Sequence, residues 1–196
     1  MLNITTFLDA NACRLDKDVF YCPERNVRYN SSEILSIISE IGRILKSHQI
    51  EKGDRVLIYL NNCPEYIFSF FGIWRIGAVA IPTNRILTEA EIKYMIEDAE
   101  AKLIITDNEA LETLKDIDTE KIVIENCDKF KDAEVLAAEE TDWDDLCQLQ
   151  YTSGTTGKPK GSMLTHGNWF TAIHNACDVL TFKQDDVFLC IYPMAH

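Results

Sequence analysis

The sequence is poor in basic residues, with 19 lysines and arginines against 32 aspartates and glutamates and a formal net charge of −13. A surface of this sign repels polyanions, which argues against nucleic acid and anionic membranes as partners. No apolar run approaches the ~20 residues that span a bilayer, so we expect no transmembrane segment. Residues 1–12 lack the basic and apolar regions of a secretion signal. The sequence therefore predicts a cytoplasmic protein.

The cysteines include no Cys-x-x-Cys pair, although there are seven of them in the chain. An odd number of scattered cysteines predicts free thiols in a reducing compartment rather than a disulfide framework. The histidines are few as well, and His166 and His174, eight positions apart, have no evident third ligand nearby. We therefore expect no metal centre built from these side chains.

What the sequence does contain is a regular alternation of apolar segments, with 46% hydrophobic residues over 196 positions. The predicted strands are 55–60, 78–82, 102–106, 121–124, 147–151 and 187–192. The predicted helices are one that begins after Asn30, 64–76, 88–99, a weaker one at 108–117, and one from Thr165 or Asn168 to about Leu180. Strands that alternate with helices predict an α/β fold with parallel-rich sheets flanked by helices.

Several local signals sharpen this prediction. Asn30 and Thr88 are each followed three residues later by a glutamate, which is the pattern of a capping box. Residues 64–76 are apolar almost all round, which favours a core helix over a ligand site. Residues 125–146 are acidic without periodicity, and we interpret them as a solvated connector, with a metal-binding aspartate cluster as the alternative.

Residues 151–161 read Tyr-Thr-Ser-Gly-Thr-Thr-Gly-Lys-Pro-Lys-Gly and concentrate three of the eight glycines. Glycines allow close backbone approach to a ligand, and successive N–H groups in such a loop form an anion site. Hydroxyls and two lysines add donors and charge, so the mixture suits a polyphosphate. The spacing does not fit the Walker loop G-x-x-x-x-G-K-[ST], because Pro159 and Ser162 stand where its second glycine would fall. The alternative is a flexible, solvated loop.

The loop resembles the phosphate-binding signature of the adenylate-forming superfamily, which comprises acyl- and aryl-CoA synthetases, peptide-synthetase adenylation domains and luciferases. The resemblance continues into Leu164-Thr165-His166-x-Asn168. Further segments look like the family's opening region and its next motif: residues 53–56, 61–65, 72, 77–79, 81–82 and 193–196. Ser162 and Arg85 depart from the usual pattern. The resemblance covers roughly residues 25–196 and implies the N-terminal portion of the acyl-CoA synthetase-like fold.

The resemblance also implies an activity. Family members use ATP and Mg²⁺ to convert a small-molecule carboxylic acid to an acyl-adenylate, and pass the acyl group to a thiol, usually that of CoA. It implies that Thr152 joins the magnesium shell and that Lys160 and His196 are catalytic, with His196 beside the acyl site. The implied phosphate-binding residues are Thr152, Ser153, Gly154, Thr155, Thr156, Gly157, Lys158 and Lys160.

Family enzymes are longer than this chain. The ribose-binding acidic residue, the glutamate that completes the magnesium site and the C-terminal domain with its lysine have no counterpart here. We therefore expect residues 1–196 to be the N-terminal part of an AMP-binding domain and to be inactive alone. Residues 81–84, Ile-Pro-Thr-Asn, favour the CoA-ligase branch, with a fatty acid as the expected substrate. The alternatives are an adenylation domain that loads a carrier protein and a non-catalytic nucleotide-binding module. We also expect apolar surface near residues 187–196 to be exposed, which favours self-association into a homo-oligomer.

Overall fold

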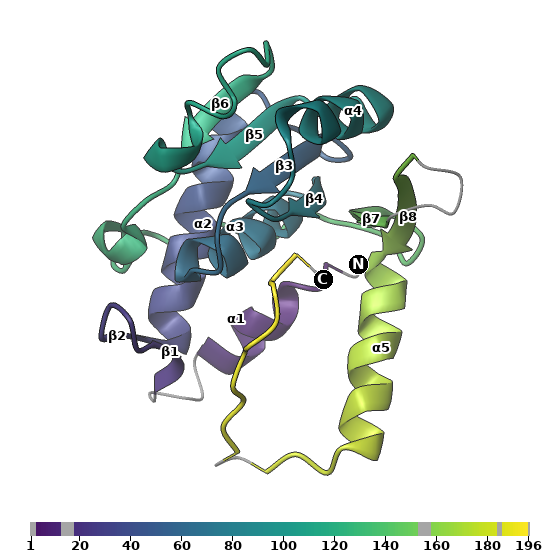
Figure 1. Cartoon of the computed structure of the whole chain (residues 1–196). Helices are drawn as coiled ribbons and strands as arrows, with labels where there is room; N and C mark the ends of the chain where they lie inside the picture. Colours follow the sequence, from purple (N-terminus) through teal and green to yellow (C-terminus); the bar gives the residue numbers. More distant parts are fainter. Residues whose placement is uncertain (1–2, 13–17, 153–157, 184–185, 196) are drawn as a thin grey trace.

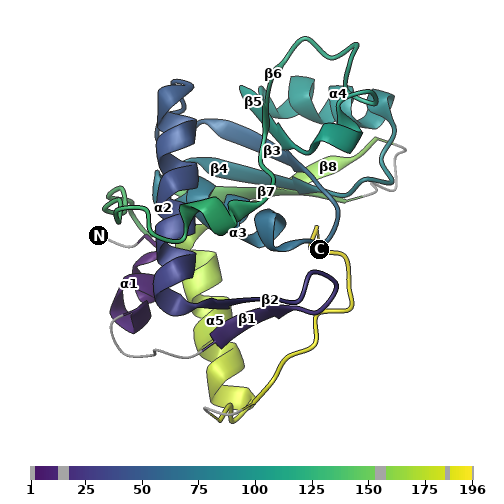
Figure 2. The same ribbon diagram turned by 90° about the vertical axis from the view of Figure 1, so that its left-hand side faces the viewer.

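The computed structural model describes residues 3–12, 18–152, 158–183 and 186–195. The described residues form a six-stranded sheet with helices on both faces, and a separate two-stranded hairpin (Figure 1; Figure 2). The strands of the sheet are β3 (Arg55–Tyr59), β4 (Val79–Thr83), β5 (Leu103–Thr106), β6 (Glu120–Val123), β7 (Leu146–Thr152) and β8 (Lys160–Thr165). The order across the sheet is β6-β5-β3-β4-β7-β8. Only β8 runs antiparallel to its neighbour, so the predicted parallel-rich α/β fold is confirmed.

The described residues contain five α-helices, of which the second and third cover one face of the sheet and the fourth covers the other. They are α1 (Thr6–Ala12), α2 (Ser31–Ser47), α3 (Pro64–Arg75), α4 (Glu89–Ala99) and α5 (His166–Val179). Strands β1 (Asp18–Cys22) and β2 (Val27–Asn30) pair as an antiparallel hairpin beside the lower end of α2 (Figure 2).

Alternate residues of β3 belong to two separate hydrophobic clusters. Val56 and Ile58 pack in the cluster that contains α2 and α3, whereas Leu57 and Tyr59 pack with α4 on the opposite face. Strands buried on both faces carry near-continuous apolar runs, because neither face meets water. This burial explains why residues 55–60 show no polar alternation.

The predicted capping boxes are present. The Asn30 side chain accepts a hydrogen bond from the Glu33 N–H at 2.9 Å, and the Glu33 carboxylate accepts one from the Asn30 N–H at 2.9 Å. Thr88 with Glu91 repeats the arrangement at the start of α4. Each box satisfies backbone donors that the first helical turn leaves unpaired, and so fixes where the helix begins.

Two predictions of secondary structure were wrong, and one strand of the sheet was not predicted. Residues 108–117 form a 3₁₀ turn at Asn108–Ala110 followed by turns, because the Asp107 side chain caps Ala110 N–H at 2.9 Å and favours a tight turn. Residues 187–192 form no strand, since the described chain places no neighbouring strand beside them. Strand β8 was not predicted, because Gly161 and Ser162 have low strand propensity and only the pairing with β7 makes them extended.

The connector between β6 and β7 contains a 3₁₀ turn at Cys127–Phe130 and no α-helix or strand, as expected for residues 125–146. The apolar side chains near the C-terminal end are largely exposed: Val187 by 93%, Leu189 by 82% and Tyr192 by 75%. The predicted exposure of this segment is therefore confirmed, although its predicted strand is not.

Candidate functional site

The predicted phosphate loop connects the two strands of a β-hairpin at the carboxyl edge of the sheet. Strand β7 is parallel to β4, so its last residue, Thr152, lies at the same edge as Asn62 after β3 and Asn84 after β4. Strand β8 returns antiparallel, with Thr152 opposite Lys160. In open α/β sheets, ligands bind outside the carboxyl ends of the parallel strands. The hairpin therefore places Thr152 and Lys160 at the edge where this class of fold binds ligands.

The described site residues of this hairpin are exposed. Thr152, Lys158 and Lys160 all reach solvent. Directly opposed residues of an antiparallel pair project from the same face, so the hydroxyl of Thr152 and the ammonium of Lys160 serve one side of the hairpin. Five of the predicted phosphate-binding residues, and the second predicted catalytic residue, lie outside the described residues: Ser153, Gly154, Thr155, Thr156, Gly157 and His196.

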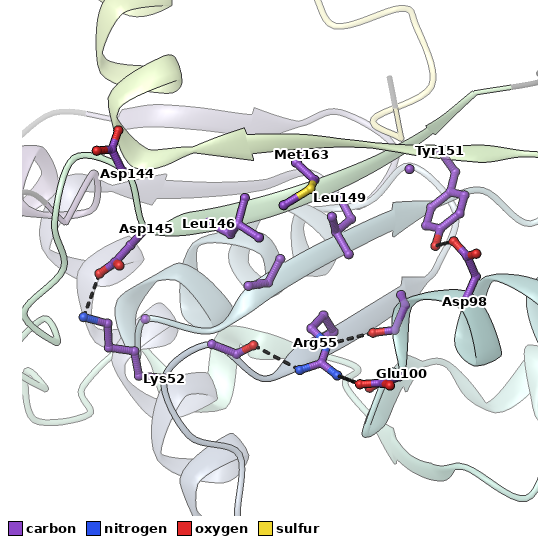
Figure 3. A pocket seen from close by; sticks show the side chains of 15 residues that line it. Lys52, Arg55, Asp98, Glu100, Asp144, Asp145, Leu146, Leu149, Tyr151 and Met163 are labelled. Carbon is purple, nitrogen blue, oxygen red and sulfur yellow. Dashed lines mark hydrogen bonds and ion pairs between the residues drawn. The ribbon is translucent and has the colours of Figure 1, made fainter.

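Helix α4 holds the base of the hairpin. On the β7 side, the Tyr151 hydroxyl donates a hydrogen bond to the Asp98 carboxylate at 2.6 Å (Figure 3). On the β8 side, the Tyr94 hydroxyl donates to the Pro159 carbonyl at 3.2 Å. Burial, together with the charge of Asp98, raises the pKa of Tyr151, so its hydroxyl remains a donor at neutral pH. Sequence reasoning assigned none of these anchoring contacts.

The segment before His196 lies against the same hairpin. The Gln150 side chain on β7 donates to the Ala195 carbonyl at 2.8 Å. The Asn62 amide donates to the Tyr192 carbonyl at 2.9 Å and accepts from the Met194 N–H at 2.9 Å. The structure thus brings the described part of the motif at 193–196 beside the strand that leads into the phosphate loop.

His166, in the segment that follows the hairpin, is a buried structural residue. Its Nδ1 accepts a hydrogen bond from the Ile4 N–H at 3.4 Å, and its Nε2 has no partner among the described residues. Burial lowers the pKa of His166 to about 4, and the nearby Asp145 only partly opposes this shift. A neutral, enclosed imidazole cannot serve as a charged contact to phosphate.

Thr152 is the predicted metal ligand, and it lies among the described residues. Over residues 3–12, 18–152, 158–183 and 186–195, no group of three histidine, cysteine or acidic side chains could hold a metal. Mg²⁺ needs no such cluster, because it binds through one or two protein oxygens plus substrate phosphates and water. An exposed hydroxyl at the hairpin base fits that mode of binding.

The described cysteines are free thiols, as expected. Cys147 on β7 is the nearest of them in sequence to the predicted phosphate loop, and burial raises the pKa of its thiol to about 12. A thiol that stays protonated is a poor nucleophile, so Cys147 belongs to the core and not to the chemistry.

A second feature beside the hairpin is an open hollow of about 680 Å³ on the α4 side of the sheet (Figure 3). Its apolar surface comes from β7 and β8, and includes Leu149 and Met163. Its cations are already engaged: Lys52 lies 2.7 Å from Asp145, and Arg55 pairs with Glu100 at 2.9 Å. The hollow is therefore less suited to phosphate than the exposed lysines of the hairpin.

None of the helices in the described part of the chain is long and apolar enough to cross a membrane.

A family model and two relatives of known name match this chain over most of its length. The family model for AMP-binding enzymes matches residues 7–196. The chain is 37% identical over 186 residues to 4-coumarate–CoA ligase 3 of Oryza sativa subsp. japonica, a match that covers 86% of this chain and 33% of the relative. It is 28% identical over 189 residues to a crotonobetaine/carnitine–CoA ligase of Escherichia coli, covering 86% of this chain and 37% of that protein. The chain thus spans about a third of the length of these relatives.

Solved structures show the same fold. The inhibitor-bound N-terminal domain of FACL13 from Mycobacterium tuberculosis superposes with a TM-score of 0.82 at 27% identity, and the match covers 100% of this chain and 52% of that one. The crystal structure of VinN superposes with a TM-score of 0.88 at 24% identity, covering 100% and 51%. The family model matches nearly the whole chain, and the fold agrees with it. This chain therefore belongs to the AMP-binding enzyme family.

Proposed function

We propose that the β7–β8 hairpin binds the β- and γ-phosphates of ATP, as part of an acid–thiol ligase that joins a carboxylic acid to CoA. The observation that carries this proposal is the placement of the hairpin. Its exposed Thr152, Lys158 and Lys160 lie at the carboxyl edge of the parallel sheet, and the segment at 192–195 is bonded beside them. A phosphate site and a second motif therefore meet at the edge where α/β sheets bind ligands.

The proposed reaction has two steps. The substrate carboxylate attacks the α-phosphorus of ATP, forming acyl-AMP and releasing pyrophosphate. The CoA thiol, losing its proton, then attacks the acyl carbonyl and displaces AMP. These steps need little covalent work from the protein, so positioning and stabilisation of charge dominate.

Within that scheme, the ammonium of Lys160 stabilises the charge that builds on the departing pyrophosphate. Residues 153–157 contribute N–H groups and hydroxyls around the same phosphates, and His196 lies beside the acyl group. Mg²⁺, held by the Thr152 hydroxyl together with phosphate oxygens, would neutralise part of the phosphate charge.

The acyl substrate that we propose is a fatty acid. An aromatic acid is the second candidate, because a relative at 37% identity is named as a 4-coumarate–CoA ligase. We also propose a cytoplasmic protein, and a homo-oligomer that covers the exposed apolar side chains of residues 187–192.

The test is ATP–pyrophosphate exchange by the full-length protein with dodecanoate, 4-coumarate and crotonobetaine, followed by thioester formation with CoA. Exchange that depends on the acid, and thioester formation that depends on CoA, are the expected results. Transfer to a phosphopantetheine carrier but not to CoA would instead indicate a carrier-loading enzyme. ATP binding without any exchange would indicate a non-catalytic nucleotide-binding module.

A further inference from the structure

We propose that helix α4 is the positioning element of the phosphate hairpin, with Tyr94 and Asp98 holding its two strands so that Lys158 and Lys160 meet the phosphates of ATP. This inference rests on the proposed function of the hairpin. It assigns a role to a helix whose own residues carry none of the predicted phosphate-binding groups.

The two anchoring bonds come from one face of the helix. Tyr94 and Asp98 are four residues apart on α4, a spacing that places both side chains on the same side of a helix. The Asp98 carboxylate accepts a hydrogen bond from Tyr151 on β7, the strand that leads into the loop. The Tyr94 hydroxyl donates to the carbonyl of Pro159, the residue directly before β8. Because each side of the hairpin is bonded to the same rigid helix, the separation of its two sides is fixed at the base of the loop.

The Tyr151 ring also explains a glycine of the loop sequence. Gly161 lies directly opposite Tyr151 in the register of β7 and β8. A Cβ atom built on Gly161 would lie 3.2 Å from the ring atom Cζ of Tyr151, closer than an ordinary van der Waals contact. The ring therefore rests across Gly161, and its hydroxyl reaches Asp98 from that position.

Tyr94 contacts a predicted phosphate-binding cation as well. The Nζ atom of Lys158 lies 5.6 Å from the centroid of the Tyr94 ring, within the range of a cation–π interaction. Such a contact at an exposed site is weak, so it keeps Lys158 near the hairpin without preventing it from turning to a phosphate. One side chain thus orders both Lys158 and the carbonyl of the residue that follows it.

The experiment removes the two hydroxyls and leaves the rings. In the full-length enzyme, Tyr94→Phe combined with Tyr151→Phe should raise the KM for ATP about 4- to 140-fold, because each of the two lost hydrogen bonds shifts an equilibrium by about 2- to 12-fold. The KM for the acid should change less than about twofold, since the bonds hold the phosphate hairpin and not the acyl site. Asp98→Asn keeps an acceptor oxygen and should stay near the wild type, whereas Asp98→Ala should behave like Tyr151→Phe.

The matched control is Tyr29→Phe on β2, which removes a buried tyrosine hydroxyl that is hydrogen-bonded to the Asp128 carboxylate. Strands β1 and β2 form a sheet of their own, apart from β7 and β8. This variant should lower thermal stability without raising the KM for ATP. Equal effects of the control and the double variant on that KM would overturn the proposal, since both would then act through stability alone.

Hydrogen exchange of the backbone amides in β7 and β8 tests whether α4 anchors the hairpin, and it does not require an active enzyme. The amides of the double variant should exchange faster at the loop end of these strands, and those of the Tyr29→Phe variant should not. Unchanged amide exchange in the double variant would overturn the proposal. It would also be overturned if the amides exchanged faster while the variant kept the KM for ATP of the wild-type enzyme. If the wild type shows no exchange of pyrophosphate, the proposed function fails, and amide exchange alone decides whether α4 anchors the hairpin.

Discussion

Lowering the pH should destabilise the folded chain through one buried residue, His166. Its side chain is fully enclosed, and burial lowers its pKa to about 4 in the folded state. In the unfolded chain its pKa is about 6.5. The depressed value means that the unfolded state binds the proton first, so stability falls as the pH drops from about 6.5 to about 4.

The magnitude follows from these two pKa values. Linkage predicts a loss of about 1.2 kcal/mol at pH 5.5 and about 2.4 kcal/mol at pH 4.5, relative to pH ~7. The charged groups that act on His166 are Asp145, which favours protonation, and Lys52, which opposes it. These two pair with each other at 2.7 Å, so their effects on the imidazole partly cancel.

The assay is urea unfolding of the 196-residue chain at a series of pH values, for the wild type and for His166→Gln, which cannot titrate. Other groups titrate equally in both proteins, so the difference between their unfolding free energies isolates His166. His174→Gln is the matched control, because its side chain is 66% exposed. The reasoning would be refuted if the difference between the two unfolding free energies stayed constant from neutral pH to pH 4.5. It would also be refuted if the wild type became more stable relative to His166→Gln as the pH fell.

Two further predictions concern packing and buried charge. Gly72→Ala should lower the free energy of unfolding by about 1–3 kcal/mol, measured by urea denaturation, because overpacking a core costs about that much and the new Cβ would lie 2.6 Å from Cγ2 of Ile41. Arg75→Met should lower it by about 1–3 kcal/mol, because a partner left without its hydrogen bond costs about that much: Arg75, 1% exposed, bonds the Leu136 carbonyl at 2.7 Å and Asp9 at 2.8 Å. Arg28→Met, at a surface pair with Asp18, should change stability by less than about 1 kcal/mol, and an equal loss at both arginines would contradict the assignment of Arg75 to the core.

Much of the fold could be predicted because local and long-range forces agree in its first half. The capping boxes at Asn30 and Thr88 mark where α2 and α4 begin, and β3 and β5 are continuous apolar runs between turns. In these segments the propensity of each residue favours the structure that the core also stabilises.

The elements that the sequence did not predict depend on partners far along the chain. Strand β8 contains Gly161 and Ser162 and is extended only because β7 lies beside it. Residues 187–192 have a strand-like composition, but no described strand pairs with them. Strand formation depends on the neighbouring strand, and the propensities of the residues themselves carry no information about a neighbour that is distant in sequence.

The candidate site shows the same division. Thr152, Lys158 and Lys160 could be selected from residue type and spacing, because hydroxyls, lysines and glycines in one loop suit phosphate. Tyr94 and Asp98 could not, since nothing in residues 89–99 indicates that one face of this helix lies against a hairpin more than 50 positions away. The bonds of Asn62 to Tyr192 and Met194 are likewise products of the fold.

The central claim, that the hairpin binds the phosphates of ATP, is tested most directly by comparing Lys160→Ala with Lys115→Ala in acid-dependent pyrophosphate exchange by the full-length enzyme. Both substitutions remove one exposed positive charge, but Lys115 lies outside the hairpin and pairs with Glu112. A charge-assisted contact contributes about 1.5–3 kcal/mol, so the account predicts that Lys160→Ala lowers the exchange rate about 10- to 100-fold while Lys115→Ala leaves it unchanged. Equal rates for the two variants would contradict the claim and make Lys160 an ordinary solvated lysine.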